Sequence, residues 1–415
     1  MKTYSANLLH WAVILFVSYL ILSIAIGFFR MVILIYFSIK QYRRNKILYK
    51  YRAINQDYFK AFRPRVTVII PVYNEEVVIR RTIRAIMKSD YPITEILIVD
   101  DGSTDSTAEI VTKIFSFSHK VTLIRKINGG KTSALNLGIQ HAIGDIIITI
   151  DADTVFQKST ISRLVENFTD STVAAVSGNC KIGNMMNPIT LWQHIEFVTA
   201  NQLDKRALDE LNCITVVPGS NSAWRKSVIQ EVGYYHHDTL AEDADLTLRI
   251  LNAGYKIIYE DRAISYEECP ETLKDFIQQR IRWSYGTLQV IWKHKKHILT
   301  SPNKGLKFFA IPSLLFSYFL FLTSPIIDIV FIISIFKGTT SIFLFSLLFY
   351  LTDLLNSFIA FKLGKERMKP LLWLIVQRLA YRYLLAYVTW KVVFKAIRGN
   401  HVGWGKLNRT GNNKY

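Results

Sequence analysis

Apolar residues are unevenly distributed along this chain: they gather in long runs at both ends and alternate with polar residues in the middle. Residues 8–37 form one such run, broken mainly by His10 and Arg30. As a helix this run would be about 45 Å long, whereas a bilayer core is about 30 Å thick, which predicts a single tilted span. A signal peptide has a shorter apolar core and a small-residue cleavage site, so we expect the segment to be retained.

Between the apolar ends, over residues 64–270, short β-rich runs alternate with helical patterns. Strands are predicted at 66–70, where Pro71 is expected to end the strand, and at 96–99, 121–124 and 146–150; helices are predicted at 76–88, from about Thr104, and at 131–142. This alternation predicts an α/β fold with a mostly parallel sheet and right-handed crossovers. Ligands of such sheets bind beyond the carboxyl ends of the strands.

The C-terminal part contains three further apolar segments, at 308–336, 341–361 and 371–396, which predict membrane helices. Four spans that begin outside the cell would leave the basic tail 397–415 outside as well, against the positive-inside rule. The last apolar segment carries Gln377, Arg378 and Arg382. Either it does not cross the membrane completely, or these side chains face a polar channel.

The formal net charge of +19 comes largely from Lys and Arg residues beside the apolar segments, above all between Lys40 and Arg52, with no acid until Asp57. This arrangement is typical of the cytosolic side of a membrane and of contact with anionic lipid. It predicts a cytosolic central domain at the plasma membrane and disfavours nucleic acid as a partner. The three cysteines are widely spaced and predict small buried side chains, with neither a disulfide framework nor a zinc site.

Two carboxylates, Asp151 and Asp153, directly follow the strand at 146–150. Oxygen ligands at a strand end can share Mg²⁺ or Mn²⁺ with a diphosphate, and such a cation would act as a Lewis acid on the leaving group. A solvated turn rich in Asp is the alternative interpretation of the same residues.

Other polar motifs follow the first three strands. Asp101 could accept a hydrogen bond from a nucleobase, or its segment could simply form a turn before a helix N-cap. Tyr73, between Pro71 and Glu75, offers a flat face for base stacking, although the proline alone could explain this motif as the end of a strand. Lys131 follows two glycines and could neutralise phosphate, or belong to an ordinary turn.

Two motifs lie further along the chain. Gly219, Ser220 and Asn221 precede Trp224, which suits a sugar site or a loop with a buried tryptophan. Glu242 and Asp243 precede a helical run. An inverting transfer needs one base to take the proton of the acceptor hydroxyl, and a carboxylate here could do so; acids favoured by the helix dipole are the alternative.

An amphipathic helix is predicted from about 272 to 292. At helical spacing Gln279, Arg282 and Trp283 share one face, where Arg can hold a diphosphate and Trp can stack on an acceptor sugar. A basic helix at the membrane interface with an anchoring tryptophan is the alternative.

Taken together, these motifs resemble those of the processive family-two glycosyltransferases, which include cellulose, chitin and hyaluronan synthases, and most of all the bacterial poly-N-acetylglucosamine synthases. The resemblance covers nearly the whole chain. It implies a GT-A fold that binds a UDP-sugar and Mg²⁺ or Mn²⁺. It further implies uracil near Asp101, Tyr73 and Glu75, the nucleotide beside Lys131, and the metal diphosphate at Asp151 and Asp153. Asp243 would be the general base, and the acceptor end and pyrophosphate would meet Gln279, Arg282 and Trp283.

The expected organisation is a transmembrane helix at 1–40, a basic juxtamembrane linker at 41–63, a cytosolic GT-A domain at 64–270, interfacial helices with the Gln-x-x-Arg-Trp element at 271–300, about three membrane segments at 301–396 and a basic tail at 397–415. Ala241 stands where relatives often have threonine, which affects the expected acceptor pocket. The membrane part is short, so a small membrane partner subunit could be needed for secretion of a polysaccharide. A transferase that adds one sugar to a membrane lipid, a synthase using another UDP-sugar, and a non-catalytic membrane scaffold or nucleotide sensor remain alternatives.

Overall fold

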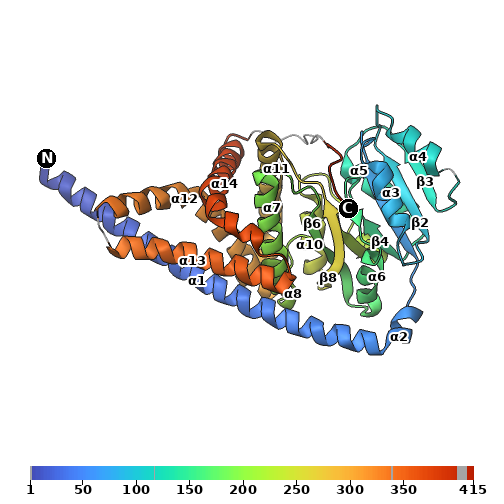
Figure 1. The fold of residues 1–415 in the computed structure, drawn as a ribbon, viewed down its shortest axis with the longest axis horizontal. Coiled ribbons are helices and arrows are strands. Elements are labelled where there is room, and N and C mark those ends of the chain that lie inside the picture. Colours follow the sequence, from blue (N-terminus) through green and yellow to red (C-terminus); the bar gives the residue numbers. More distant parts are fainter. Residues whose placement is uncertain (1, 116, 338–339, 400–408) are drawn as a thin grey trace.

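The computed structural model describes the whole chain except residues 1, 116, 338–339 and 400–408. Its centre is one eight-stranded sheet with strand order β3-β2-β1-β4-β7-β6-β8-β5. Helices cover both faces of this sheet, and a bundle of long helices extends from one side of it (Figure 1). The structure therefore has the α/β architecture that the alternating sequence pattern predicts.

The first half of the sheet is parallel, because β1 pairs in parallel with both β2 and β4, and β2 with β3. Its elements are β1 (Val66–Val72), α3 (Ile79–Met87), β2 (Glu95–Asp100), α4 (Thr107–Phe115), β3 (Val121–Arg125), α5 (Lys131–His141) and β4 (Ile146–Thr149). All four predicted strands are confirmed. The prediction that Pro71 ends β1 is wrong: Pro71 stays in register opposite Val99, and the strand continues to Val72.

Alternation of side chains along β1 explains why both faces of the sheet are covered. Ile69 packs into one buried cluster with residues of α5, and its neighbours Val68 and Ile70 pack into a second cluster with residues of α3 and α4. The α5 backbone approaches the sheet closely, since a Cβ added to Gly138 would lie only 2.7 Å from a methyl carbon of Ile69. A sheet buried on both faces in this way exposes only its strand ends, where polar groups can gather.

The second half of the sheet is mixed: β7 is antiparallel to β4 and β6, whereas β6 and β8 are parallel. Its elements are β5 (Val155–Phe156), α6 (Thr160–Val165), the 3₁₀ helix η1 (Glu166–Thr169), β6 (Val173–Ile182), α7 (Pro188–Thr199), the π-helix η2 (Ala200–Lys205), α8 (Arg206–Glu210), β7 (Ser222–Arg225), α9 (Lys226–Glu231), α10 (Glu242–Asn252) and β8 (Lys256–Glu267).

The N-terminal apolar run is part of a single long helix, α1 (Lys2–Ile54), which is followed by α2 (Gln56–Ala61). The segment 41–63, expected as a linker, is thus helical over most of its length. The other long elements are α11 (Leu273–Thr300), the π-helix η3 (Leu306–Ala310), α12 (Ile311–Lys337), α13 (Thr340–Gly364), the 3₁₀ helix η4 (Lys369–Trp373) and α14 (Leu374–Ile397). In Figure 1, α1 runs beside α13 and then along the sheet domain.

Within the described residues, two helical stretches are long and apolar enough to cross a membrane, Ile21–Ile54 and Leu306–Val330. A bent pair, Lys369–Arg378 and Ala380–Ile397, would make a third if it forms one span. The two arginines of α14 are paired within this bundle, since Arg378 pairs with Asp353 and Arg382 pairs with Asp328. Such pairing lets charged side chains lie among apolar helices.

The end of the chain returns to the sheet domain, as Figure 1 shows. The ring of Tyr415 stacks on that of Tyr266 with centroids 3.6 Å apart, and Asn413 Nδ2 donates to the Tyr266 carbonyl oxygen at 3.0 Å. Arg81 of α3 donates to the carbonyl oxygens of Gly411 and Asn413. Residues 409–415 therefore belong to the surface of the sheet domain.

Candidate active site

A cleft of about 420 Å³ opens at the carboxyl ends of β1, β2 and β4, where the parallel sheet predicts a ligand site. Nine of the residues singled out from the sequence line it: Pro71, Tyr73, Glu75, Asp101, Lys131, Asp151, Asp153, Glu242 and Arg282. Asp243, Gly219, Ser220, Asn221, Gln279 and Trp283 are not among its lining residues. The cleft thus gathers residues from four elements, β1, α5, α10 and α11, from the loops after the strands and from the C-terminal tail.

Asp101 organises the loop between β3 and α5. Its Oδ1 accepts hydrogen bonds from Lys126 Nζ at 2.6 Å and from the Gly129 amide at 2.9 Å, and its Oδ2 accepts one from the Gly130 amide at 2.7 Å. Gly130 has φ of +86°, a conformation that favours glycine. A nucleobase meeting Asp101 would therefore share a carboxylate that already shapes the loop.

Lys131 begins α5 and is the cationic centre of the cleft. Its Nζ lies 2.6 Å from Asp151 Oδ1 and 3.7 Å from Glu242 Oε1. Burial would lower the pKa of this ammonium, but the neighbouring carboxylates outweigh burial and raise the Lys131 pKa above its usual value. The same pairing holds the pKa of Asp151 below its usual range despite burial. Lys131 therefore stays charged where a diphosphate would lie.

Asp153 is buried and pairs with a residue of the tail: Arg409 lies 2.6 Å from Asp153 Oδ2. Burial raises the pKa of Asp153, with Asp151 and Glu268 adding to the effect and Arg409 opposing it. Carboxylates this close together need cationic partners. The Arg409 guanidinium supplies one such charge here.

These carboxylates suit a divalent metal ion. Asp151 and Asp153 are hard oxygen donors one residue apart, and Asp151 and Glu268 add to the effect of burial on the pKa of Asp153, a contribution that a bound cation would oppose. Since Arg409 touches Asp153, a metal bound there would require this guanidinium to shift or to share the carboxylate.

Glu242 and Asp243 form the first turn of α10, where the helix dipole favours negative charge. Asp243 Oδ1 accepts a hydrogen bond from the Ala244 amide at 2.8 Å. Burial raises the pKa of Asp243 and of Glu242, while Lys131 opposes the rise in both. A raised pKa makes a carboxylate a better proton acceptor in its ionised form.

The turn before β7 holds three residues that the sequence predicted for a sugar site, Gly219, Ser220 and Asn221. The first lies beside the cleft, and the other two lie in the core. A Cβ added to Gly219 would lie 3.0 Å from Lys131 Nζ, so the turn backs onto the cleft. Asn221 is fully buried and donates to the Ala263 carbonyl oxygen and to Ser265 Oγ. Ser220 is also buried. Asn221 and Ser220 therefore lie in the core and hold the turn in position instead of lining the cleft.

Trp224 corresponds to the buried-tryptophan alternative and not to a sugar platform. Its side chain is fully buried, and its Nε1 donates to Ser222 Oγ at 2.9 Å and to Thr149 Oγ1 at 3.2 Å. The indole thereby ties β7 to β4 beneath the cleft.

Helix α11 brings its Gln-x-x-Arg-Trp element to the cleft from the side of the bundle. Arg282 lines the cleft, and burial lowers its pKa against the opposing influence of Glu242 and Asp151. Gln279 is buried, and its Oε1 has no hydrogen-bond partner within the described part of the chain. The neighbouring Arg280 faces away, pairing with Glu196 of α7 at 2.6 Å and lying 4.6 Å from the Trp283 ring centroid.

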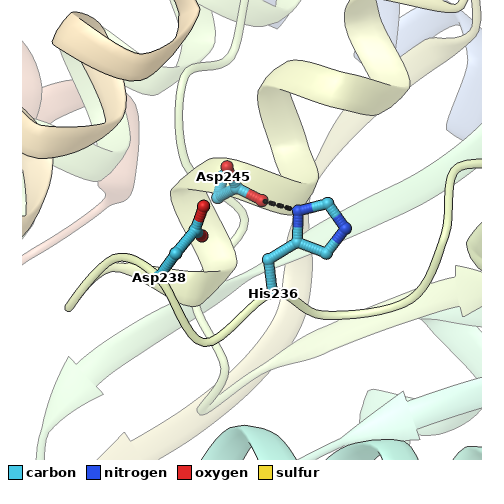
Figure 2. A group of neighbouring side chains, drawn as sticks. All are labelled: His236, Asp238 and Asp245. Carbon is cyan, nitrogen blue, oxygen red and sulfur yellow. Dashed lines mark ion pairs between the residues drawn. The ribbon is translucent and has the colours of Figure 1, made fainter.

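A second group of possible metal ligands lies at α10 and the segment before it, where His236, Asp238 and Asp245 converge (Figure 2). Asp245, however, already accepts from Arg249 at 2.9 Å and from His294 at 2.7 Å, and Lys293 lies 2.7 Å from it. A metal ion would have to compete with two cations, Arg249 and Lys293, and with the imidazole of His294. We interpret the group as a structural link between α10 and α11.

Sequence patterns did not indicate three residues that line the cleft, His237, Thr239 and Arg409, nor Lys126, which donates to Asp101 from outside the lining. Arg409 lies in a polar tail without periodicity, and its contact with Asp153 joins residues far apart in the chain. Lys126 precedes the predicted glycine motif by two residues, so its charge was the only available signal. The three cysteines are buried and free, as predicted.

The fold and the acidic cleft together define a class of enzyme, the nucleotide-sugar glycosyltransferases. Residues 67–233 match the model of the family described as glycosyl transferase family 2. The chain is 31% identical over 375 residues to the probable glycosyltransferase YdaM of Bacillus subtilis, covering 85% of this chain and 88% of the relative. The chain belongs to glycosyltransferase family 2 and is a hexosyltransferase.

Two further relatives bear on the fold and on the activity. Poly-beta-1,6-N-acetyl-D-glucosamine synthase of Staphylococcus aureus is 32% identical over 227 residues, which cover 54% of this chain and only 55% of that protein. The mannosyltransferase PcManGT of Pyrobaculum calidifontis, solved with GDP-Man and Mn²⁺, matches 89% of this chain and all of its own with a TM-score of 0.54 and 20% identity. This likeness confirms the GT-A fold.

Proposed function

We propose that this chain is an inverting, metal-dependent membrane glycosyltransferase that polymerises UDP-N-acetylglucosamine into a β-linked polysaccharide. The observation that carries the proposal is the position of two carboxylates at the start of α10: Glu242 lies 3.7 Å from the cationic centre at Lys131, and the neighbouring Asp243 feels the charge of Lys131. Similarity to the staphylococcal synthase across the catalytic half supports the choice of donor and product.

Donor binding follows from the lining of the cleft. Tyr73, which is partly exposed, would stack on uracil, and Asp101 would accept its ring N–H. Lys131 and Arg282 would hold the diphosphate by charge. Asp151 and Asp153 would hold Mg²⁺ or Mn²⁺, and the bound cation would withdraw electron density from the leaving diphosphate.

Asp243 would act as the general base. Its carboxylate would take the proton of the acceptor hydroxyl while that oxygen attacks the anomeric carbon from the side opposite the diphosphate. The bond to the diphosphate breaks, UDP leaves, and the anomeric centre is inverted. Trp283, on the same helix as Arg282, would support the acceptor sugar together with Gln279 and the turn at Gly219.

The membrane elements would place this reaction at the cytosolic face of the plasma membrane. We assign residues 64–270 to the cytosolic GT-A domain and 271–300 to the element that joins it to the membrane. The polymer would leave through the bundle at 301–396 and α1, with a small partner subunit where the bundle is too short to enclose it.

The test is a donor screen on the purified full-length protein. Released UDP and product length are measured with UDP-N-acetylglucosamine, UDP-glucose and GDP-mannose, with and without a chelator. We expect UDP and long polymer from UDP-N-acetylglucosamine only, loss of both on metal removal, and loss of turnover with retained UDP binding in Asp243→Asn. A product carrying a single sugar on lipid would exclude polymerisation, and an active Asp243→Asn protein would exclude Asp243 as the base.

A further inference from the structure

A second cavity, of about 570 Å³, lies at the junction of α1, α2 and the sheet domain. It shares no lining residue with the cleft at Lys131, Asp151 and Asp153, which we call the donor cleft. Phe62 and Arg63 line it just before β1 begins, and Tyr91 and Pro92 line it just before β2. The cavity is thus at the amino ends of the parallel strands, whereas the donor cleft is at their carboxyl ends. We call it the amino-edge cavity.

The amino-edge cavity is cationic. Two carboxylates, Asp90 and Glu166, line it, against five basic side chains: Arg52, Lys60, Arg63, Arg163 and Arg262. Glu166 is already shared, since it lies 2.9 Å from Arg163 and 3.1 Å from Arg262. Lys60 and Arg63 are exposed, and no carboxylate of the described residues lies within ion-pair distance of either. Arg262 also pairs with Glu260 at 2.8 Å, so the positive charge that the protein does not neutralise is that of Lys60 and Arg63.

Arg52 is the buried part of this wall. Only 7% of the residue is exposed, and its contacts to Glu166 and Glu260 are long, at 3.5 and 3.4 Å. Asn167 accepts one further hydrogen bond from it, but its Nε has no partner within the described residues. Burial lowers the pKa of this guanidinium, with the two glutamates opposing the effect. A buried donor without a partner requires an explanation, and an anion bound in the cavity beside Arg52 would supply one.

Aromatic rings complete the lining, from Tyr49, Phe59, Phe62 and Tyr91. Tyr91 is held in place because its hydroxyl donates to the Pro64 carbonyl oxygen at 2.6 Å. Small-molecule sites are typically about 300–1,000 Å³, with apolar walls and a few placed polar groups. Guanidinium groups favour phosphate because they can donate two parallel hydrogen bonds.

We propose that the amino-edge cavity binds a phosphate ester, with its phosphate held by Arg52, Lys60 and Arg63 and its organic part against the aromatic rings. A soluble nucleotide and the headgroup of an anionic phospholipid share this chemistry. Because Tyr49 and Arg52 belong to α1 and Tyr91 belongs to the sheet domain, a bound phosphate ester would join the membrane helix to the catalytic domain.

The experiment uses the full-length protein in phosphatidylcholine nanodiscs, with UDP present at saturation to occupy the donor cleft. One arm measures binding of GMP by calorimetry. The other measures melting temperature as phosphatidylglycerol replaces part of the phosphatidylcholine. The test variant is Lys60→Gln with Arg63→Gln, both at exposed positions. The matched control is Arg84→Gln with Lys113→Gln, which removes the same charge from another basic surface hollow.

We expect either GMP binding that weakens about tenfold or more in the test variant, or stabilisation by phosphatidylglycerol that disappears in it, with the control unchanged. The first result identifies a soluble source of phosphate and the second a headgroup. If neither probe acts, or if the control loses the effect equally, the proposal is wrong. Because turnover is not measured, failure here is distinct from failure of the proposed polymerase activity.

Discussion

At the scale of single residues, Lys131 shows how one side chain serves several partners. It pairs with Asp151 and approaches Glu242, so the same ammonium stabilises the two groups of carboxylates that would handle donor and acceptor. In Lys131→Met we expect UDP to bind about 10- to 100-fold more weakly, because a charge-assisted contact of roughly 1.5–3 kcal/mol is lost. Calorimetry with UDP measures the change, and Lys113→Met is the control for lost surface charge. Unchanged UDP affinity would remove Lys131 from the donor site.

Lys205 illustrates the opposite case, a cation inside the protein without an acidic partner. Its Nζ donates to Ser177 Oγ at 3.2 Å and lies 5.7 Å from the Tyr259 ring centroid, with no carboxylate of the described residues within 4 Å. Burial lowers its pKa to about 8, although nearby groups oppose the shift, namely Cys180, Asp243 and Glu267. Between pH 8 and about 10.5 the unfolded chain therefore binds more protons than the folded protein, so stability rises with pH.

Replacing Lys205 by Met removes this proton linkage. We expect Lys205→Met to be more stable than the parent by on the order of 1–2 kcal/mol at pH 7, with the difference shrinking as the pH rises past 8. Thermal unfolding in detergent at several pH values measures this, and the exposed Lys158→Met serves as control. A constant difference across the pH range would contradict the shifted pKa.

At the scale of elements, the link between α10 and α11 depends on Asp245. Its buried carboxylate meets Arg249, Lys293 and His294, and these contacts hold the pKa of Asp245 far below its usual value despite burial. We expect Asp245→Asn to lose about 3–5 kcal/mol of stability, since two partly buried cations, Arg249 and Lys293, lose their buried counter-charge. Asp238→Asn is the matched control: it removes an exposed partner of Lys293 and should cost under about 1 kcal/mol. Equal melting temperatures for the two variants would disprove the link.

At the scale of elements, local sequence predicted some features of the structure and not others. The strands that end at Asp100 and before Asp151 are buried apolar runs, and a parallel sheet brings their carboxyl ends together, so the donor cleft was predictable. The helical continuation of α1 past residue 40 could not be predicted, because the basic residues there indicated only a membrane boundary. The contact between Arg409 and Asp153 could not be predicted either, because it depends on the tertiary position of a tail whose sequence has no periodicity.

At the scale of the whole molecule, the position of the tail restricts the path through the membrane. Residues 409–415 pack on the sheet domain, for example through Lys414, whose amide donates to the Gly183 carbonyl oxygen at 3.2 Å. The chain that leaves the sheet domain after α11 must then return to the same side of the membrane. This requires an even number of complete membrane crossings between α11 and the tail. Helices α12 and α13 would supply two. The bent pair formed by η4 and α14 would then be re-entrant, which is what the first of the two alternatives drawn from Gln377, Arg378 and Arg382 predicts.

This path predicts the labelling of single introduced cysteines, because all three native cysteines are buried. Lys414→Cys and Lys88→Cys, on the tail and the sheet domain, should react with a membrane-impermeant maleimide from the same side, in inverted but not in right-side-out vesicles. Thr3→Cys, at the other end of α1, should react from the opposite side. If Lys414→Cys and Thr3→Cys were labelled from one side, α14 would cross completely and the tail could not reach Asp153 in the membrane-embedded protein.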